Sequence, residues 1–293
     1  MKEIKVKAPA KINLTLEVLN KREDGFHDIR SIMQTVSLYD YLTFSVDETE
    51  GIQIELSGNS EEIPYDEKNL IYKAALKYLE KAEISNVKIN CFLEKNIPVE
   101  AGLAGGSTDA AATLFALNRL YDNKLSQEEI MSLCAEIGSD VPFCYRGGCA
   151  ICTSRGEKIR PIPFVEMSVS LVKAKNYKIS AKEAYDEFDM SERKEYRDYT
   201  EELVKLIIRG GFDENLLHND LEAPLCKKYH YVNNMRKFIK NSLMSGSGPV
   251  FFVMKKSFDI GFEPDEFWVA EYLRTTGKGA EEVVECRNPL QKT

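Results

Sequence analysis

A glycine-rich stretch in the first half of the chain has the composition of a phosphate-binding loop. Three glycines, Gly102, Gly105 and Gly106, fall within five residues, and the polar run Ser107-Thr108-Asp109 follows them. Glycine lets backbone N–H groups approach a ligand closely, and the unpaired N–H groups at the start of a helix attract anions. The alanine-rich segment 110–120 is typical of such a helix. Taken alone, the loop also fits a tight turn before a well-capped helix.

The spacing of this stretch differs from the two common nucleotide-binding motifs. No lysine follows the glycines, as a Walker A loop requires, and the glycines do not match Gly-x-Gly-x-x-Gly. The stretch therefore predicts that nucleotide phosphates are bound by a loop of another kind.

Two more segments of the chain contain residue types that could contribute to a phosphate-binding site. Near the N-terminus, Pro9-Ala10-Lys11-Ile12-Asn13-Leu14 precedes Arg22-Glu23-Asp24-Gly25-Phe26-His27, and Ser245-Gly246-Ser247-Gly248-Pro249 stands near the C-terminus. Together with Pro98–Asp109, these segments resemble the three motifs of the GHMP kinases in order and rough spacing. The resemblance extends over nearly the whole chain, and it implies an ATP-dependent kinase that phosphorylates an alcohol.

The resemblance implies a fold of two α+β domains with the active site in the cleft between them. Strands and helices that mix without strict alternation also favour α+β over a doubly wound α/β sheet. Segment 155–163 is rich in charge and proline and is the candidate boundary. We therefore expect an ATP-binding domain at residues 1–155 and a second domain at residues 156–293.

Two charged residues have catalytic roles in this resemblance. It implies that the Asp140 carboxylate accepts or orients the proton of the acceptor hydroxyl, and that Lys11 stabilises the developing charge on the alkoxide and the γ-phosphate. Judged singly, Asp140 could instead cap the turn before Pro142, and Lys11 could be a solvated charge on a strand.

The nucleotide is expected to lie along the glycine-rich loop. The resemblance assigns its phosphates to Pro98, Gly102, Leu103, Ala104, Gly105, Gly106, Ser107 and Thr108, and its adenine pocket to Asn69 and Lys95. Hydroxyl groups such as those of Ser107 and Thr108 bind phosphate or Mg²⁺, which we expect to arrive with ATP rather than at a metal site of the protein. Ala104 stands where the family usually has glycine, and Ala181 where it often has threonine.

The segment around Phe26 and His27 bears on the identity of the acceptor. In one branch of the family an aromatic residue and a histidine at this place bind a cytosine ring, and Asn13 belongs to the same substrate site. The resemblance thus implies transfer to the 2-hydroxyl of a cytidine-diphosphate-linked polyol, a step in the non-mevalonate synthesis of isoprenoid precursors. A GHMP kinase for mevalonate, homoserine or a sugar is the alternative, as is a catalytically inactive nucleotide-binding regulator.

The composition and net charge argue against two classes of binding partner. The 293 residues carry a formal net charge of −8 without a long basic run, which argues against binding to nucleic acid or to an anionic membrane. The N-terminus has no apolar segment typical of a signal peptide, and no apolar run approaches the ~20 residues that span a bilayer. We expect a cytoplasmic protein that is a monomer or a weak homodimer.

The seven cysteines fit reduced thiols in a cytoplasm. Cys144, Cys149 and Cys152 have a spacing that can hold an iron–sulfur cluster. Their segment is typical of a strand, a Gly-Gly turn and a second strand, on which Cys149 and Cys152 would face opposite ways. Buried, inert thiols are therefore the favoured interpretation.

Periodicity predicts the elements that must position these residues. Alternation over residues 11–18 indicates a half-buried strand whose polar face carries Lys11 and Asn13. A capping box at Ser126 opens a helix for which Gly138 is the stop signal. The remaining expected elements are a hairpin of strands 42–46 and 52–56, a helix at 69–80, a strand at 87–93, helices near 181–188 and 200–209, a strand at 250–254, a helix near 265–275 and a last strand at 283–286.

Overall fold

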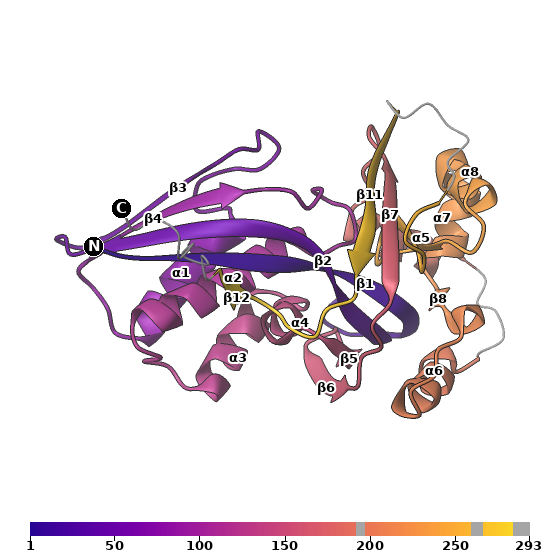
Figure 1. The fold of residues 1–293 in the computed structure, drawn as a ribbon, viewed down its shortest axis with the longest axis horizontal. Helices are drawn as coiled ribbons and strands as arrows, with labels where there is room; N and C mark the ends of the chain where they lie inside the picture. Colours follow the sequence, from indigo (N-terminus) through magenta and orange to yellow (C-terminus); the bar gives the residue numbers. More distant parts are fainter. Residues whose placement is uncertain (192–196, 259–265, 284–293) are drawn as a thin grey trace, which may run out of the picture.

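A long antiparallel pair of strands from the N-terminal part of the chain runs through the molecule (Figure 1). The computed structural model describes residues 1–191, 197–258 and 266–283. The two strands are β1 (Lys2–Lys21) and β2 (His27–Asp47). The predicted strand at 11–18 is the centre of β1, but it is buried on both faces rather than one. The polar face that carries Lys11 and Asn13 is therefore covered by other parts of the fold.

In the described residues, β1 and β2 belong to an eight-stranded sheet with the order β12-β1-β2-β4-β3. The predicted hairpin between strands 42–46 and 52–56 is wrong, because β4 (Val87–Glu94) lies between β2 and β3 (Ile52–Gly58). β4 pairs antiparallel with β2 and parallel with β3. The sheet continues through β5 (Cys149–Ser154), which pairs with β2, and β6 (Lys158–Ile162), which pairs with β5.

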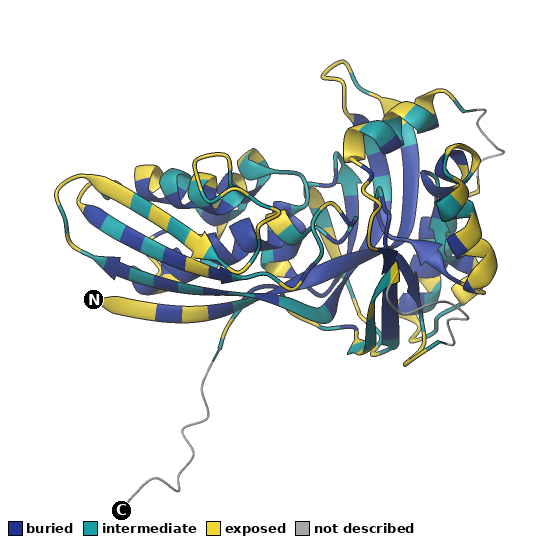
Figure 2. Ribbon diagram, turned by 90° about the horizontal axis from the view of Figure 1, so that it is seen from above, coloured by how far each residue is buried: buried dark blue, intermediate teal, exposed yellow. Residues whose placement is uncertain are grey.

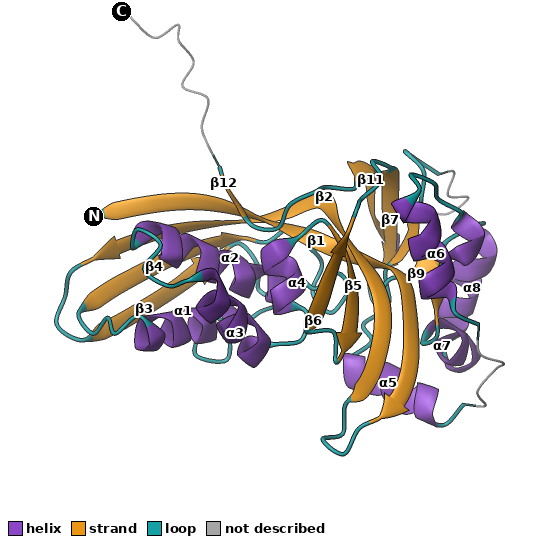
Figure 3. Cartoon of the chain, turned by 90° about the horizontal axis from the view of Figure 1, so that it is seen from below, coloured by secondary structure: helices purple, strands orange, loops and turns teal. Residues whose placement is uncertain are grey.

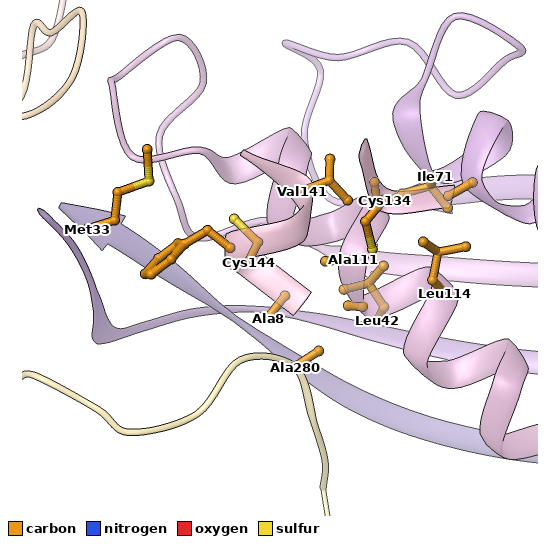
Figure 4. Packing of buried hydrophobic residues seen from close by; sticks show 14 of the residues in the cluster. Ala8, Met33, Leu42, Ile71, Ala111, Leu114, Cys134, Val141, Cys144 and Ala280 are labelled. Carbon is orange, nitrogen blue, oxygen red and sulfur yellow. The ribbon is translucent and has the colours of Figure 1, made fainter. Parts of the chain in front are cut away.

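Four helices cover one face of this sheet (Figure 3): α1 (Leu70–Lys81), α2 (Gly105–Leu120), α3 (Gln127–Ile137) and α4 (Val141–Arg146). The capping box at Ser126 is present at the start of α3, and Gly138 is its C-cap. Figure 4 shows side chains of these helices, among them Leu114, Cys134 and Val141, in the core above the strands. The sheet and the helices thus share one apolar core, and α2 is held against the sheet by its buried residues.

A second sheet stands beside the far end of the β1–β2 pair (Figure 1). In the described residues it has four strands in the order β11-β7-β10-β9, which are β7 (Ser168–Ala174), β9 (Leu243–Met244), β10 (Phe251–Val253) and β11 (Phe267–Arg274). The helical elements here are α5 (Ala181–Asp189), α6 (Tyr199–Ile208), the 3-10 helix η1 (Glu214–Leu216), α7 (Glu222–Lys228) and α8 (His230–Phe238). Buried residues are concentrated in the strands where the two parts meet (Figure 2).

One expectation for the second half needs correction. Residues 267–274 form β11 rather than a helix, because they pair with β7 along a ladder that is interrupted between Ala270 and Leu273. β12 (Glu281–Glu282) lies just before the strand expected at 283–286, which stays a prediction because residues 284–286 lie outside the described residues. The expected helices near 181–188 and 200–209 and the strand at 250–254 are confirmed as α5, α6 and β10.

The two halves of the sequence are interleaved at β1. Both β8 (His218–Asn219) and β12 pair with this strand, so the second half contributes to the large sheet. The β5–β6 hairpin also crosses residue 155. The division into domains at residues 155 and 156 stays a prediction.

Candidate active site

The glycine-rich loop is shaped by three residues in the left-handed region. Glu100, Gly102 and Ala104 have φ angles of 49°, 75° and 59°. α2 starts at Gly105, so the polar run 107–109 lies within its first turns rather than before the helix, as the expected segment 110–120 would place it. The backbone N–H of Lys11 donates to the carbonyl of Leu103 at 3.1 Å and ties the loop to β1. The loop therefore presents a helix N-terminus beside the strand that carries Lys11.

The glycine turn near the C-terminus packs against this loop, as the resemblance implied. The Ser245 hydroxyl donates to the carbonyl of Gly102 at 3.0 Å. A β-carbon on Gly102 would lie 2.0 Å from the Ser245 carbonyl oxygen, so no side chain fits there. Asn219 holds the turn from the other side through hydrogen bonds to the carbonyls of Met244 and Gly246, at 2.7 and 2.8 Å.

Lys11 and Asp140 lie next to each other, 3.6 Å apart between Nζ and Oδ2, with side chains 5% and 30% exposed. Lys11 Nζ also donates to Asn13 Oδ1 at 2.7 Å, and Asn13 Nδ2 donates to Ser31 Oγ at 2.8 Å. A chain of hydrogen bonds thus holds a buried ammonium toward a carboxylate that solvent reaches. This is the arrangement that a phosphoryl-transfer site needs.

The alternative roles of these two residues do not fit the geometry. Asp140 is the N-cap residue of α4, yet its side chain makes no capping hydrogen bond. Lys11 is buried, so it is not a solvated charge on the strand face. Gly246 lies close to Lys11, because a β-carbon on it would lie 3.2 Å from Lys11 Nζ. Among the described residues, the Asp140 carboxylate is therefore paired with Lys11 and remains partly exposed.

His27 lies in a second cluster, formed with α5. Its ring stacks on Tyr185 with centroids 4.9 Å apart and an interplanar angle of 15°, and Nε2 is 2.8 Å from Asp189 Oδ1. Although partial burial opposes it, hydrogen bonds from Lys21 and His27 lower the pKa of the Asp189 carboxyl. The Tyr185 ring and the Asp189 carboxylate, both on α5, thus hold His27 in one orientation.

Tyr185, which stacks on His27, was not singled out in the sequence analysis. Burial, with a smaller contribution from the charge of Asp140, raises the pKa of the Tyr185 hydroxyl. Among the described residues, Phe26 makes no ring contact with this cluster; it is 53% exposed, and the Arg155 guanidinium lies 5.1 Å from its ring centroid. No motif in the sequence pointed to Tyr185, which lies four residues after Ala181.

The two residues assigned to the adenine pocket have structural roles here. Asn69 is the N-cap of α1: its side chain accepts from the N–H of Ile71 and donates to the carbonyl of Pro64. Lys95 is buried and forms ion pairs with Asp40 and Asp109, the latter at 3.4 Å. Their contact with adenine stays a prediction.

Asp40 is the other residue that the sequence did not single out. One of its oxygens accepts from the backbone N–H groups of Asn96 and Ile97 at 2.6 and 2.8 Å, and the other contacts Lys95. Burial and the neighbouring Asp40 raise the pKa of Asp109, although Lys95 opposes this. The triad of Asp40, Lys95 and Asp109 connects β2, the start of the glycine-rich loop and the first turns of α2.

The remaining predicted ligands differ in their burial. Pro98, Gly105 and Ser107 are half-buried and Gly106 is exposed, whereas Leu103 and Thr108 are fully buried. The Thr108 hydroxyl therefore faces the protein interior in this structure. Its contact with phosphate or Mg²⁺ stays a prediction, as does that of Ser107.

The cysteines do not form a metal centre in the part of the chain that is described. Cys144 belongs to α4 rather than to a strand, and Cys149 and Cys152 belong to β5. All three thiols are buried and unlinked, and burial raises the pKa of Cys149 to about 12. No group of three or more potential ligand side chains could hold a metal ion among the described residues. Within the same residues, no helix combines the length and apolarity needed to cross a bilayer.

Comparison with known sequences identifies a related family. Residues 69–148 match the model of the GHMP kinases N terminal domain. The chain is 42% identical to a 4-diphosphocytidyl-2-C-methyl-D-erythritol kinase of Caldicellulosiruptor saccharolyticus, over 92% of this chain and 96% of the relative. It is 38% identical to the protein of that name from Clostridium beijerinckii, over 86% of this chain and 90% of the relative.

Comparison with solved structures agrees on the fold. A crystal structure of 4-(cytidine 5'-diphospho)-2C-methyl-D-erythritol kinase superimposes with a TM-score of 0.68 and 28% identity, over 94% of this chain and all of the other. A homoserine kinase from Cytophaga hutchinsonii gives a TM-score of 0.72 at 19% identity, over 97% and 98% of the two chains. The second similarity concerns the fold alone, so shape does not discriminate between acceptors.

Proposed function

Because the chain belongs to the family of 4-diphosphocytidyl-2-C-methyl-D-erythritol kinases, we propose that Lys11 and Asp140 carry out its reaction. The protein is an ATP-dependent kinase that phosphorylates the 2-hydroxyl of 4-diphosphocytidyl-2-C-methyl-D-erythritol in the non-mevalonate isoprenoid pathway. The observation that carries the assignment is the 3.6 Å pair of a buried ammonium and a partly exposed carboxylate beside the glycine-rich loop.

In the proposed mechanism, Asp140 receives the proton of the 2-hydroxyl while the oxygen attacks the γ-phosphorus, and ADP leaves as its bond to the γ-phosphorus breaks. Lys11 stabilises the negative charge on the attacking oxygen and on the transferring group. Asn13 orients the ammonium through its 2.7 Å hydrogen bond. Positioning and charge neutralisation account for most catalysis of phosphoryl transfer, so three residues from two elements can suffice.

The nucleotide phosphates are proposed to lie at the N-terminus of α2. The left-handed residues of the loop and the free N–H groups of the first helical turn form a concave, electropositive cradle. The Ser107 hydroxyl is an oxygen donor of the kind that Mg²⁺ prefers, and this ion keeps several waters and binds through few protein groups. When bound, Mg²⁺ would neutralise charge on the β- and γ-phosphates.

The acceptor is proposed to enter from the side of α5. His27 and Tyr185 offer a ring surface and a ring nitrogen, which suit a flat base with hydrogen-bonding edges. The base must take the place of Asp189 at His27 Nε2 or use the other ring nitrogen. Phe26 reaches the base only by turning inward from its exposed position.

We further propose a cytoplasmic location and a monomer or weak homodimer. The buried, unlinked thiols of the described residues fit a reducing compartment.

A substrate panel tests the function. The purified protein is given ATP and Mg²⁺ with the cytidyl substrate, methylerythritol phosphate, mevalonate, homoserine or galactose, and ADP release is measured. We expect efficient turnover of the cytidyl substrate alone. Faster turnover of any other acceptor, or ADP release that Asp140→Asn does not reduce, would overturn the proposal.

A further inference from the structure

Asn219 joins the glycine turn near the C-terminus to the strand that carries Lys11. The residue is 4% exposed and belongs to β8, which pairs in parallel with β1 at Leu16. The backbone N–H of Asp220 donates to the carbonyl of Leu16 at 2.9 Å, and the Asp220 carboxylate accepts from the N–H of Val18 at 2.8 Å. The backbone around Asn219 is therefore fixed to β1.

The amide of Asn219 holds two carbonyls of the turn at once. Nδ2 donates to the carbonyls of Met244 and Gly246, and Oδ1 accepts from the N–H of Leu221 at 3.0 Å, which fixes the orientation of the amide. A side-chain amide has two N–H donors, so one residue can serve both carbonyls. Buried carbonyls need such partners, because leaving one unpaired is costly.

The two carbonyl residues differ in their other ties. Met244 is held a second time, because its N–H donates to the Glu222 carboxylate at 2.7 Å. Among the residues that the structure describes, no group other than the Asn219 amide donates to the Gly246 carbonyl. Loss of the amide would therefore release Gly246 more than Met244.

Gly246 lies against the side chains that we propose for catalysis. A β-carbon on it would be 3.2 Å from Lys11 Nζ and 3.3 Å from Asn13 Oδ1. The hydrogen bond between Lys11 and Asn13 thus runs beside Gly246. The glycine-rich loop is tied to the turn separately, through the Ser245 hydroxyl and the Gly102 carbonyl. A shift of Gly246 would thus reach the ammonium while the tie to the loop remains.

We propose that Asn219 is a positioning residue for phosphoryl transfer, which sets the place of the Lys11 ammonium through the Gly246 carbonyl; this inference rests on the proposed function. Its effect falls on kcat rather than on nucleotide binding, because the loop and the start of α2 keep their own hydrogen bonds. A misplacement of about 1 Å can lower a rate by about 100-fold, so a small release of the turn is enough.

The test is a double-mutant cycle between Asn219→Ser and Lys11→Ala, with single-turnover rates on ATP and the cytidyl substrate as the readout. Serine lacks the two-donor amide. We expect Asn219→Ser to lower the rate by ~10- to 100-fold in the parent. In the Lys11→Ala background the loss should be less than about twofold, because the ammonium that Asn219 positions is gone.

Calorimetry with ADP separates positioning from folding. The affinity for ADP should stay within about twofold of the parent in Asn219→Ser, since the phosphate cradle is retained. The number of ADP-binding sites per chain corrects the rate for any unfolded protein. Asn219→Asp supplies a second variant: it keeps the shape of the side chain and the acceptor for Leu221, but a carboxylate cannot donate to Gly246. It should show the same dependence on Lys11.

Asn118→Ser is the matched control. Asn118 is another buried amide, 7% exposed, which donates to the carbonyl of Leu125 at 3.1 Å and accepts from its N–H at 3.0 Å. It lies about 20 Å along the axis of α2 from Gly105. We expect a lower Tm in this variant, with the rate per ADP-binding site unchanged in both backgrounds.

Three kinetic results would overturn the proposal: an equal fold-loss of Asn219→Ser with and without Lys11, a loss of the same size in Asn118→Ser, or a weaker affinity for ADP at an unchanged rate. Crystal structures of the parent and of Asn219→Ser give a readout that needs no activity. We expect Gly246 and Lys11 Nζ to move, which changes the 3.6 Å distance to Asp140; an ammonium that stays in place contradicts the role of Asn219.

The proposed function fails separately, if the parent and Asn118→Ser both leave the cytidyl substrate unphosphorylated. The two crystal structures still decide in that case whether Asn219 positions Lys11.

Discussion

The ammonium of Lys95 lies directly beneath Gly105, where it would be 2.7 Å from a β-carbon at that position. Lys95 in turn contacts Asp40 and Asp109, so the first residue of α2 rests on a buried ion triad. Neither Gly105 nor Gly106 has a positive φ; Gly102 and Ala104 do. The need for glycine at the helix start is therefore a matter of close approach rather than backbone strain.

Gly105→Val and Gly106→Val should consequently differ. A side chain at position 106 meets only Leu70, at 3.5 Å, so Gly106→Val should fold normally and lose ATP binding by blocking the phosphates. Gly105→Val should also disturb Lys95 and lower the Tm. Calorimetry with ADP and thermal unfolding separate the two effects. Unchanged ADP affinity in both variants would mean that the phosphates lie elsewhere.

Ala104→Gly should stabilise the protein. Ala104 has φ 59° and ψ 32°, a left-handed conformation that costs an alanine about 1 kcal/mol relative to glycine. Urea unfolding should show a gain of that order, with the KM for ATP unchanged. A loss of stability would indicate that the flexibility of glycine in the unfolded chain outweighs the relief of strain.

Asp140→Asn and Lys11→Ala should each lower kcat by ~10²–10⁴-fold, the range for removal of a positioned acid–base group. ADP affinity should stay close to that of the parent, because the loop and the start of α2 hold the phosphates. Single-turnover rates and calorimetry measure the two quantities. Near-normal turnover by Asp140→Asn would contradict the role of its carboxylate.

His27→Ala and Tyr185→Ala should both raise the KM for the cytidyl substrate without weakening ADP binding. Loss of a ring that stacks on a base weakens binding of that base by about 1–3 kcal/mol.

Phe26→Tyr should be nearly neutral, since that side chain is mostly exposed. Methylerythritol phosphate should be a poor acceptor for the parent. Equal turnover of this truncated compound would rule out cytosine recognition by the cluster.

Asp109→Asn should stabilise the protein near neutral pH. Burial and Asp40 raise the folded-state pKa of Asp109 above the unfolded value of about 3.9. Stability from this group is therefore complete below about pH 4 and is lost as pH rises through the folded-state pKa. The asparagine side chain does not titrate, and the ion pair between Asp40 and Lys95 remains in the variant. The stability difference between variant and parent should therefore shrink toward pH 4; a difference independent of pH would contradict the shifted pKa.

Local interactions made several elements predictable from the sequence. The alternation over residues 11–18, the capping box at Ser126 and the glycine-rich loop before a helix each depend on side chains within a few residues of one another. Such patterns act through hydrogen bonds and burial of one face, which neighbouring residues decide. The motifs of the GHMP kinases likewise indicated the reaction, because their residue types specify its chemistry.

Only the tertiary structure decided which distant segments meet. β4 enters between β2 and β3, and β7 pairs with residues 267–274 and holds them in a strand. Both outcomes depend on partners far along the chain, so local propensity could not predict them. The same holds for Asp40 beneath the glycine-rich loop and for Tyr185 against His27, because each contact joins residues that lie far apart in the sequence.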